Sequence, residues 1–187
     1  MRDVAKRYLA ALDELDRHVH AIGTAKWSSP TPCTQWDVRA LVDHLVYETL
    51  WVPDLLAGST LADVGDRYEG NRLGEDPVAA WRLAKTAAAE SARTSPLDVA
   101  VHTSGGELTP QEYLTQMLFD AAIHGWDLAT AIGVEHTIPD DVARDLEAWF
   151  GPQVEEMVAA RIIAEPVPVG ADADAATRLI GLSGRTP

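Results

Sequence analysis

The sequence predicts an all-α protein, an antiparallel bundle of four long helices with short additional helices and room for a minor hairpin. Three observations support this fold class. Apolar residues recur at spacings of three and four over four long segments, as on one face of an amphipathic helix. Capping signals precede two of these segments, and proline- or glycine-containing stretches separate them. No internal repeat is evident, so residues 1–187 are expected to form a single domain.

The first helix is expected over residues 3–22. Its apolar residues recur mostly at spacings of three and four, with charges between them: Val4, Tyr8, Ala11, Leu12, Leu15 and Val19. His18 and His20 lie near its carboxyl end, where imidazoles interact favourably with the helix dipole. That interaction is the role we expect for both histidines.

The second helix is expected from residue 35 to about residue 56, after a proline-rich connection over residues 27–34. Thr34 followed three residues later by Asp37 is a variant of the capping-box pattern at which helices start. Pro53 is expected to kink this helix or to end it early, because proline removes a backbone donor.

A polar connection over residues 57–76 is about as long as a structureless loop should be, so it is either a functional flap or contains short helical turns. Pro77 then marks a helix start, and the alanine-rich residues 78–92 form the third helix. Alternating valines and the turn signal Ser-Gly-Gly predict a strand or hairpin over residues 99–106.

The fourth long helix follows a capping box formed by Thr109 and Glu112, with Pro110 at its first position. Gly133 is expected to end it as a C-cap. A further helix is expected from residue 139 to about residue 161, and the Gly-Pro pair within it should kink or split it.

After that helix, two prolines favour an extended passage over residues 166–169. A last short helix is expected over residues 173–182.

Composition and charge exclude several classes of function. The chain is 47% apolar and 24% charged, and its net charge of −14 argues against nucleic acid and against an anionic membrane surface as partners. No apolar run approaches a membrane span, and the amino terminus lacks the apolar core of a signal peptide, so a cytoplasmic protein is expected. The single cysteine, Cys33, excludes an internal disulfide and a cysteine-based zinc cluster.

An acid and a histidine lie four residues apart in the fourth long helix. At about 100° per residue, four steps return the chain to nearly the same azimuth, so Asp120 and His124 point the same way. His44 and Glu48, on the second helix, lie on the corresponding shoulder of its apolar face. If these edges of the apolar faces of the second and fourth helices face each other, their side chains would form one site. We predict that His44, Asp120 and His124 bind a divalent metal ion.

Two imidazoles and one carboxylate leave coordination positions open, as in catalytic rather than structural zinc sites. Zinc is expected from the ligand types, and nickel, iron and manganese are alternatives. An incoming thiol would bind as thiolate. No separate general base is evident. An Asp–His pair at this spacing also occurs as a simple hydrogen bond on a helix surface, so the motif alone leaves both interpretations open.

Several other residues have two interpretations. Asp43 and Asp127 either orient the histidines or are solvated charges. Cys33 precedes a helix start, where a thiolate would be stabilised, or packs as a small apolar residue. His102 and His136 lie in connections and are assigned no role. Three tryptophans either line a cleft or pack in the core: Trp36, Trp51 and Trp126.

Three segments, in order along the chain, resemble one known family. Residues 27–45, WSSPTPCTQWDVRALVDHL, resemble the opening of the metal-binding domain of mycothiol-dependent maleylpyruvate isomerases, within the DinB-like superfamily. Residues 120–129, DAAIHGWDLA, resemble that family's second metal motif. Residues 179–187, LIGLSGRTP, resemble the tail of its short actinobacterial members.

This resemblance implies a DinB-like four-helix bundle with His44, Asp120 and His124 as metal ligands and mycothiol as cosubstrate. The family's isomerase has glutamate where Asp120 stands, and it carries an additional C-terminal domain for which this chain has no residues left. The resemblance therefore implies metal binding and thiol chemistry more strongly than it implies maleylpyruvate as the substrate.

Two functions follow. The first is a metal-dependent transferase or isomerase that activates a small thiol as thiolate for reaction with a small electrophile. The second is a non-catalytic helical module of the same fold that binds a metal or another ligand. The helix faces left over in such a bundle would also allow a homodimer.

Overall fold

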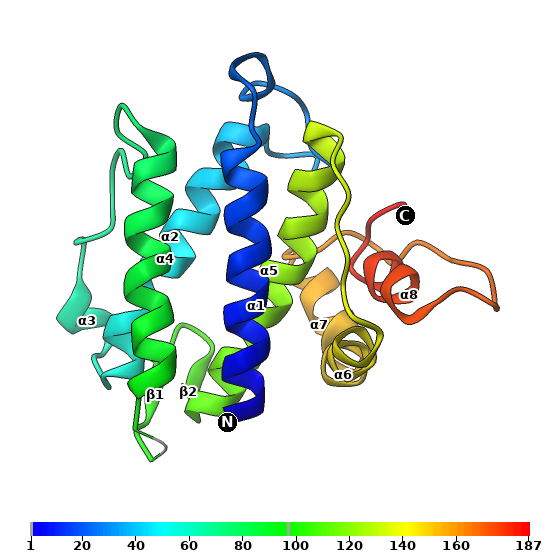
Figure 1. Cartoon of the computed structure of the whole chain (residues 1–187). Helices are drawn as coiled ribbons and strands as arrows, with labels where there is room; N and C mark the ends of the chain where they lie inside the picture. Colours follow the sequence, from blue (N-terminus) through cyan, green and yellow to red (C-terminus); the bar gives the residue numbers. More distant parts are fainter. Residues whose placement is uncertain (1, 97) are drawn as a thin grey trace.

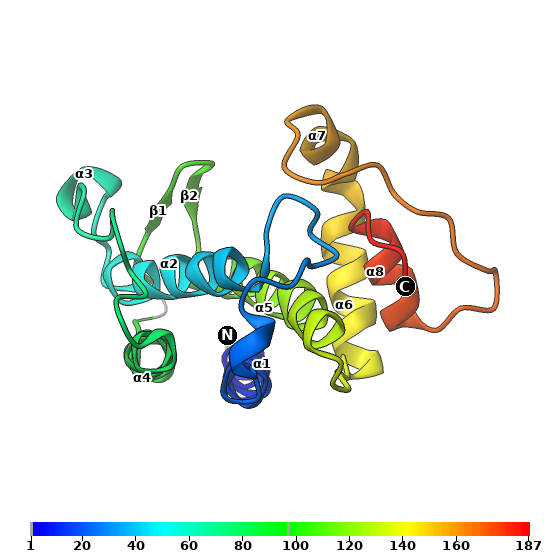
Figure 2. The same cartoon turned by 90° about the horizontal axis from the view of Figure 1, so that it is seen from above.

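The computed structural model describes residues 2–96 and 98–187, and within these ranges the regular secondary structure is helical apart from one small hairpin (Figure 1). Four long helices form a bundle: α1 (Arg2–His20), α2 (Val38–Leu56), α4 (Pro77–Thr94) and α5 (Pro110–Ile132). Helices α1 and α4 form one layer and α2 and α5 the other, and each helix contacts both a layer mate and a helix of the other layer (Figures 1 and 2). The predicted all-α, DinB-like bundle is confirmed.

The four helices run in two opposite directions, α1 and α5 one way and α2 and α4 the other (Figure 1). Because α2 and α4 share a direction, their connection has to return along the length of the bundle, and this explains its length. The short helix α3 (Leu61–Val64) lies within it and begins at a capping box between Thr60 and Asp63. Of the two interpretations of this connection, the one with a short helical turn is therefore confirmed.

The core consists of the apolar faces of these four helices. Its largest fully buried side chains include Tyr8 and Leu12 from α1, Leu41 from α2, Trp81 from α4 and Leu114 from α5. These positions are the apolar stripes seen in the sequence, so burial of the stripes holds the layers together.

The start of α2 differs from the prediction. The helix begins at Val38, and Asp37 is its N-cap, accepting a hydrogen bond from the backbone N–H of Ala40. The preceding connection folds back, so that the carbonyls of Ser29 and Trp27 accept from the first two helical N–H groups. These bonds satisfy donors that an additional helical turn would otherwise have to satisfy. Residues 34–37 consequently stay outside the helix.

Proline has different effects in the two helices that carry the predicted metal ligands. Pro53 lies inside α2, which continues past it to Leu56, the end expected from the sequence; of the two effects expected of Pro53, an early end does not occur. Helix α5 begins and ends as predicted. Thr109 and Glu112 form the capping box, Pro110 occupies the first turn, and Gly133 is the C-cap with a φ of 81°. That left-handed conformation suits glycine, which has no Cβ.

The residues after α5 pack beside it rather than extending the bundle (Figure 2). They form α6 (Asp140–Phe150), the 3₁₀ turn η2 (Gly151–Gln153), α7 (Val154–Ala159) and α8 (Ala175–Leu182). The predicted split at Gly151-Pro152 is confirmed. Arg7 of α1 pairs with Asp141 and Asp145 of α6. Arg178 of α8 pairs with Glu147, so ion pairs tie these helices to one another and to the bundle.

The predicted hairpin is formed by β1 (Val101–Thr103) and β2 (Gly106–Leu108), which pair antiparallel near the amino-terminal end of α5. A 3₁₀ turn, η1 (Thr24–Lys26), follows α1. None of the helices in the described parts of the chain is long and apolar enough to cross a membrane.

The histidines near the end of α1 have different environments. His20 is exposed, and its Nδ1 lies 2.8 Å from the carbonyl oxygen of Asp16. His18 is buried, and its Nε2 forms a 3.0 Å hydrogen bond with Nδ1 of His136. Both histidines lie in the last turn of α1 as expected, and His18 has in addition a partner, His136, that was assigned no role. The contact between His18 and His136 is not visible in the sequence, because 118 positions separate the two rings.

Candidate metal centre

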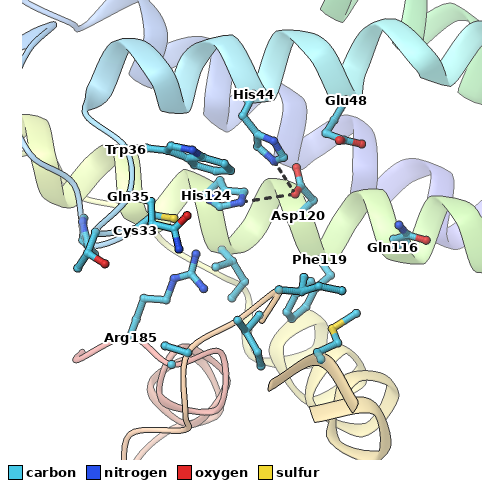
Figure 3. A pocket seen from close by; sticks show the side chains of 18 of the residues that line it. Cys33, Gln35, Trp36, His44, Glu48, Gln116, Phe119, Asp120, His124 and Arg185 are labelled. Carbon is cyan, nitrogen blue, oxygen red and sulfur yellow. Dashed lines mark hydrogen bonds and ion pairs between the residues drawn. The ribbon is translucent and has the colours of Figure 1, made fainter. Parts of the chain in front are cut away.

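His44, Asp120 and His124 converge between α2 and α5 (Figure 3). Oδ1 of Asp120 lies 3.2 Å from Nε2 of His44 and 3.6 Å from Nε2 of His124. One potential ligand atom from each residue lies within 4.8 Å of the others. Ligands about 2.0–2.1 Å from a tetrahedral zinc ion are about 3.3 Å apart, so this spacing suits a single ion.

The pKa values of Asp120 and His44 depend on the charges of their neighbours. Burial by itself raises the pKa of Asp120, but His44 and His124 outweigh it and lower the pKa of this carboxyl overall. Burial by itself lowers the pKa of His44, but the carboxylates of Asp120, Glu48 and Asp43, Asp120 foremost, together raise that pKa overall. The Asp120 carboxylate is therefore ionised at neutral pH, which is the form that binds a cation.

Asp127 holds the ring of His124 from the side away from Asp120. Its Oδ2 lies 2.9 Å from Nδ1 of His124 and also accepts a 2.9 Å hydrogen bond from Arg185. The Asp127 side chain is fully buried. Burial raises its pKa, but the hydrogen bonds with His124 and Arg185 lower it overall, so Asp127 is ionised. An ionised carboxylate only accepts, so Nδ1 of His124 donates to Asp127, and Nε2 is the ring nitrogen directed towards Asp120.

Trp36 covers both histidines. Its ring centroid lies 4.5 Å from that of His44 and 5.5 Å from that of His124 (Figure 3). Thr31 fixes the residue by donating from its Oγ1 to the Trp36 carbonyl at 2.8 Å. This contact depends on the folded-back connection before α2, which keeps Trp36 outside the helix. An apolar ring at this position shields the imidazoles from water.

The three residues line one wall of a cavity of about 440 Å³. Phe119, Trp149 and Ile162 give the cavity an apolar side. Glu48 also lines it and points towards Asp120 (Figure 3), and burial, followed by the nearby Asp120, raises its pKa to about 7. The helical spacing predicted that Glu48 lies on the same side of α2 as His44. Its raised pKa could not be predicted, because it depends on burial that only the folded chain creates.

The other predicted residues separate into those at the cavity and those elsewhere. Cys33 lines the cavity, but burial raises the pKa of its thiol, which does not support the stabilised thiolate. Asp43 pairs with Arg72 rather than with His44. Two tryptophans and one histidine lie away from the cavity lining: Trp51, which contacts Tyr47 and Tyr68, Trp126, which packs on the core, and His102, which lies beside Glu107 in the hairpin.

Arg185 was missed by sequence reasoning as a site residue. It lies in the tail, lines the cavity and pairs with Asp127. Its segment was noted only for its resemblance to other tails, and an arginine near a carboxyl terminus carries no signal for a partner 58 positions away.

Fold and side chains together define a DinB-like helical-bundle protein with a His–Asp–His candidate metal centre open to a cavity. A family model, described as the mycothiol maleylpyruvate isomerase N-terminal domain, matches residues 8–129, well over half of the chain. The chain belongs to this family. A search of curated proteins and a search of solved structures found no match.

Proposed function

We propose that this chain is a metal-dependent enzyme that activates a small thiol, mycothiol, for reaction with a small electrophile. The proposed ligands are His44 Nε2, Asp120 Oδ1 and His124 Nε2, and zinc is the expected ion. The observation that carries the proposal is the convergence of these atoms at the wall of a cavity large enough for small molecules. Membership of the family supports the choice of thiol.

A divalent ion bound there would supply a Lewis acid and lower the pKa of a coordinated thiol. Asp120 neutralises one of the two positive charges, and an incoming thiolate neutralises the other. Asp127 fixes the His124 ring in the tautomer that leaves Nε2 free. Trp36 excludes water from the imidazoles, and Phe119 and Trp149 offer an apolar surface to the electrophile.

In an isomerase, the thiol sulfur forms a C–S bond with a conjugated carbon while the π electrons move to the carbonyl oxygen. Rotation about the former double bond follows, and the C–S bond then breaks as the electrons return. In a transferase, the carbon adjacent to the carbonyl takes a proton instead and the C–S bond remains. Glu48, with a pKa of about 7, is suited to accept the thiol proton and to return it.

We further propose that residues 1–187 act as one domain. The support is that Arg185, near the end of the chain, pairs with Asp127, which in turn holds His124. Removal of the tail would leave the buried Asp127 carboxylate without its cationic partner, and the proposed centre would lose its support.

The test is elemental analysis of the purified, untagged protein, followed by an assay of thiol depletion with a panel of electrophiles. We expect about one equivalent of zinc at the proposed centre that is lost in His124→Ala. The matched control is His102→Ala, which removes a histidine outside the cavity and should leave the metal content unchanged. Metal without any thiol-dependent turnover would favour the non-catalytic binding module instead. Full metal content in both His44→Ala and His124→Ala would overturn the ligand assignment.

A further inference from the structure

A second cluster of potential ligands lies between α1 and the connection that follows α5. Nε2 of His18 is 3.0 Å from Nδ1 of His136 and 3.5 Å from Oε1 of Glu14. The three residues offer ligand atoms that all lie within 4.8 Å of one another. In the described residues only this cluster and the His44–Asp120–His124 cluster have that property.

The two clusters are built in the same way. Glu14 and His18 lie four residues apart on one helix, as Asp120 and His124 do, and a histidine from a distant element completes each set. The separations of 3.0 and 3.5 Å bracket the about 3.3 Å expected between two ligands of a tetrahedral zinc ion. The resemblance is one of geometry and of donor chemistry.

Helix α5 is shaped to admit the His136 ring. A Cβ placed on Gly125 would lie 2.7 Å from Cε1 of His136, closer than side chains pack, so the ring can rest there only because residue 125 is glycine. Gly125 follows His124 directly in the helix. Because successive residues are about 100° apart, the two clusters lie on different sides of α5.

We propose that Glu14, His18 and His136 form a second divalent-metal site, distinct from the cavity and suited to zinc. Two imidazoles and a carboxylate are ligands that zinc prefers in proteins. The ion would join α1 to the connection after α5 and stabilise the fold there. This site lies outside the residues that line the cavity, so it does not depend on the proposed thiol chemistry.

The surroundings keep both rings in the form that binds metal. Burial, followed by the charge of Arg17, lowers the pKa of His18. Burial, followed by His18, lowers the pKa of His136 to about 4, so both imidazoles are neutral at pH 7. Arg17 also pairs with the other oxygen of Glu14. Its side chain is 67% exposed and can turn into solvent, which leaves Glu14 accessible from outside.

The test is zinc titration of the untagged, chelator-treated full chain by calorimetry, with elemental analysis after gel filtration. We expect two equivalents for the wild type and one for His18→Gln, for His136→Gln and for His44→Gln. The double variant His18→Gln/His44→Gln should bind none. His20→Gln is the matched control, because His20 lies on the same helix but outside the cluster, and it should still bind two.

Glu14→Gln tests the site even if the histidine variants fail to fold. Glu14 lies at the partly exposed side of the cluster, and glutamine preserves its size, so this variant should fold normally. We expect it to weaken zinc binding at this site at least tenfold while the circular dichroism spectrum stays unchanged. One equivalent in the wild type that survives in both His18→Gln and His136→Gln would overturn the second site and leave the first intact. One equivalent in the wild type that is lost in both His18→Gln and His136→Gln but kept in His44→Gln would support the second site and overturn the first.

Discussion

Oδ2 of Asp127 lies 2.9 Å from Nδ1 of His124 and accepts a hydrogen bond of the same length from Arg185. One buried oxygen thus links the tail of the chain to a proposed metal ligand. The imidazole cannot rotate without breaking a hydrogen bond inside the protein, where no water replaces it. The direction of Nε2 is therefore set by a residue outside the proposed ligand set.

Asp127→Asn should weaken metal binding about 10–100-fold without removing a ligand. Residues that hydrogen-bond to the second ring nitrogen of a metal-binding histidine commonly have effects of this size when they are mutated. The asparagine amide can present an N–H to Nδ1, which favours the wrong tautomer. The measurement is competitive zinc titration against a chelating dye. Asp43→Asn is the matched control, since Asp43 also flanks a proposed ligand but pairs with Arg72. Equal losses in the two variants would contradict the positioning role of Asp127.

The bundle could be predicted from the sequence because its signals are local. Apolar stripes identify the long helices, and the capping box at Thr109 fixes the start of α5. The start of α2 could not be found in this way. Thr34 and Asp37 satisfy a capping pattern, yet the carbonyls of Trp27 and Ser29, carried by a folded-back connection, bond to the first helical N–H groups. A pattern over four residues contains no information about such a return of the chain.

Thr109→Ala should destabilise the protein by about 1 kcal/mol, the usual cost of losing an N-cap side chain. The Thr109 hydroxyl oxygen accepts a hydrogen bond from the backbone N–H of Glu112 at 3.2 Å, and the Glu112 carboxylate accepts one from the backbone N–H of Thr109. Urea unfolding measures the change. Thr115→Ala is the control, because Thr115 lies on the same helix but its hydroxyl only bonds to the preceding turn. A loss in Thr115→Ala as large as that in Thr109→Ala would show that the cap has no special contribution.

The candidate site also has parts that could be predicted from the sequence and parts that could not. His44, Asp120 and His124 could be proposed from helical spacing, since position on a helix face follows from sequence. The roles of Trp36 and Arg185 could not, because they depend on how a loop and a tail return to the bundle. The pairing of His18 with His136 was missed for the same reason.

Arg161→Gly should stabilise the protein by about 0.5–1 kcal/mol, since a left-handed residue other than glycine costs roughly 1–2 kcal/mol and glycine forfeits part of that gain in the unfolded chain. Arg161 has a φ of 60°. It follows α7, where Arg161 N–H bonds to Val158 and Ile162 N–H to Met157, a helix end that usually carries glycine. Urea unfolding is the measurement. Arg161→Ala removes the same side chain but keeps the strain, so it should give no gain, and equal gains in both variants would contradict this explanation.

Metal-free protein should lose stability as the pH falls from about 6.5 to 4, and His136 should account for much of that loss. Its pKa is lowered to about 4 in the folded chain, by burial and then by His18, against an ordinary value of 6.5. Between these values the unfolded chain binds the additional proton, so the free energy of unfolding falls with pH, by roughly 3 kcal/mol at most from this residue. Above pH 7 both states are neutral and the contribution vanishes.

The measurement is urea unfolding with chelator present at pH 7 and pH 5, for the wild type and for His136→Gln. Glutamine does not titrate, so the drop between the two pH values should be smaller in the variant. His18, Glu14 and Arg17 face the same cluster, and of these His18 also titrates with a lowered pKa, so part of the slope should persist in His136→Gln and shrink further in His18→Gln/His136→Gln. His102→Gln should retain the full drop, because His102 lies in the hairpin outside this cluster. An unchanged drop in the double variant would show that the two rings are not the groups that protonate on unfolding.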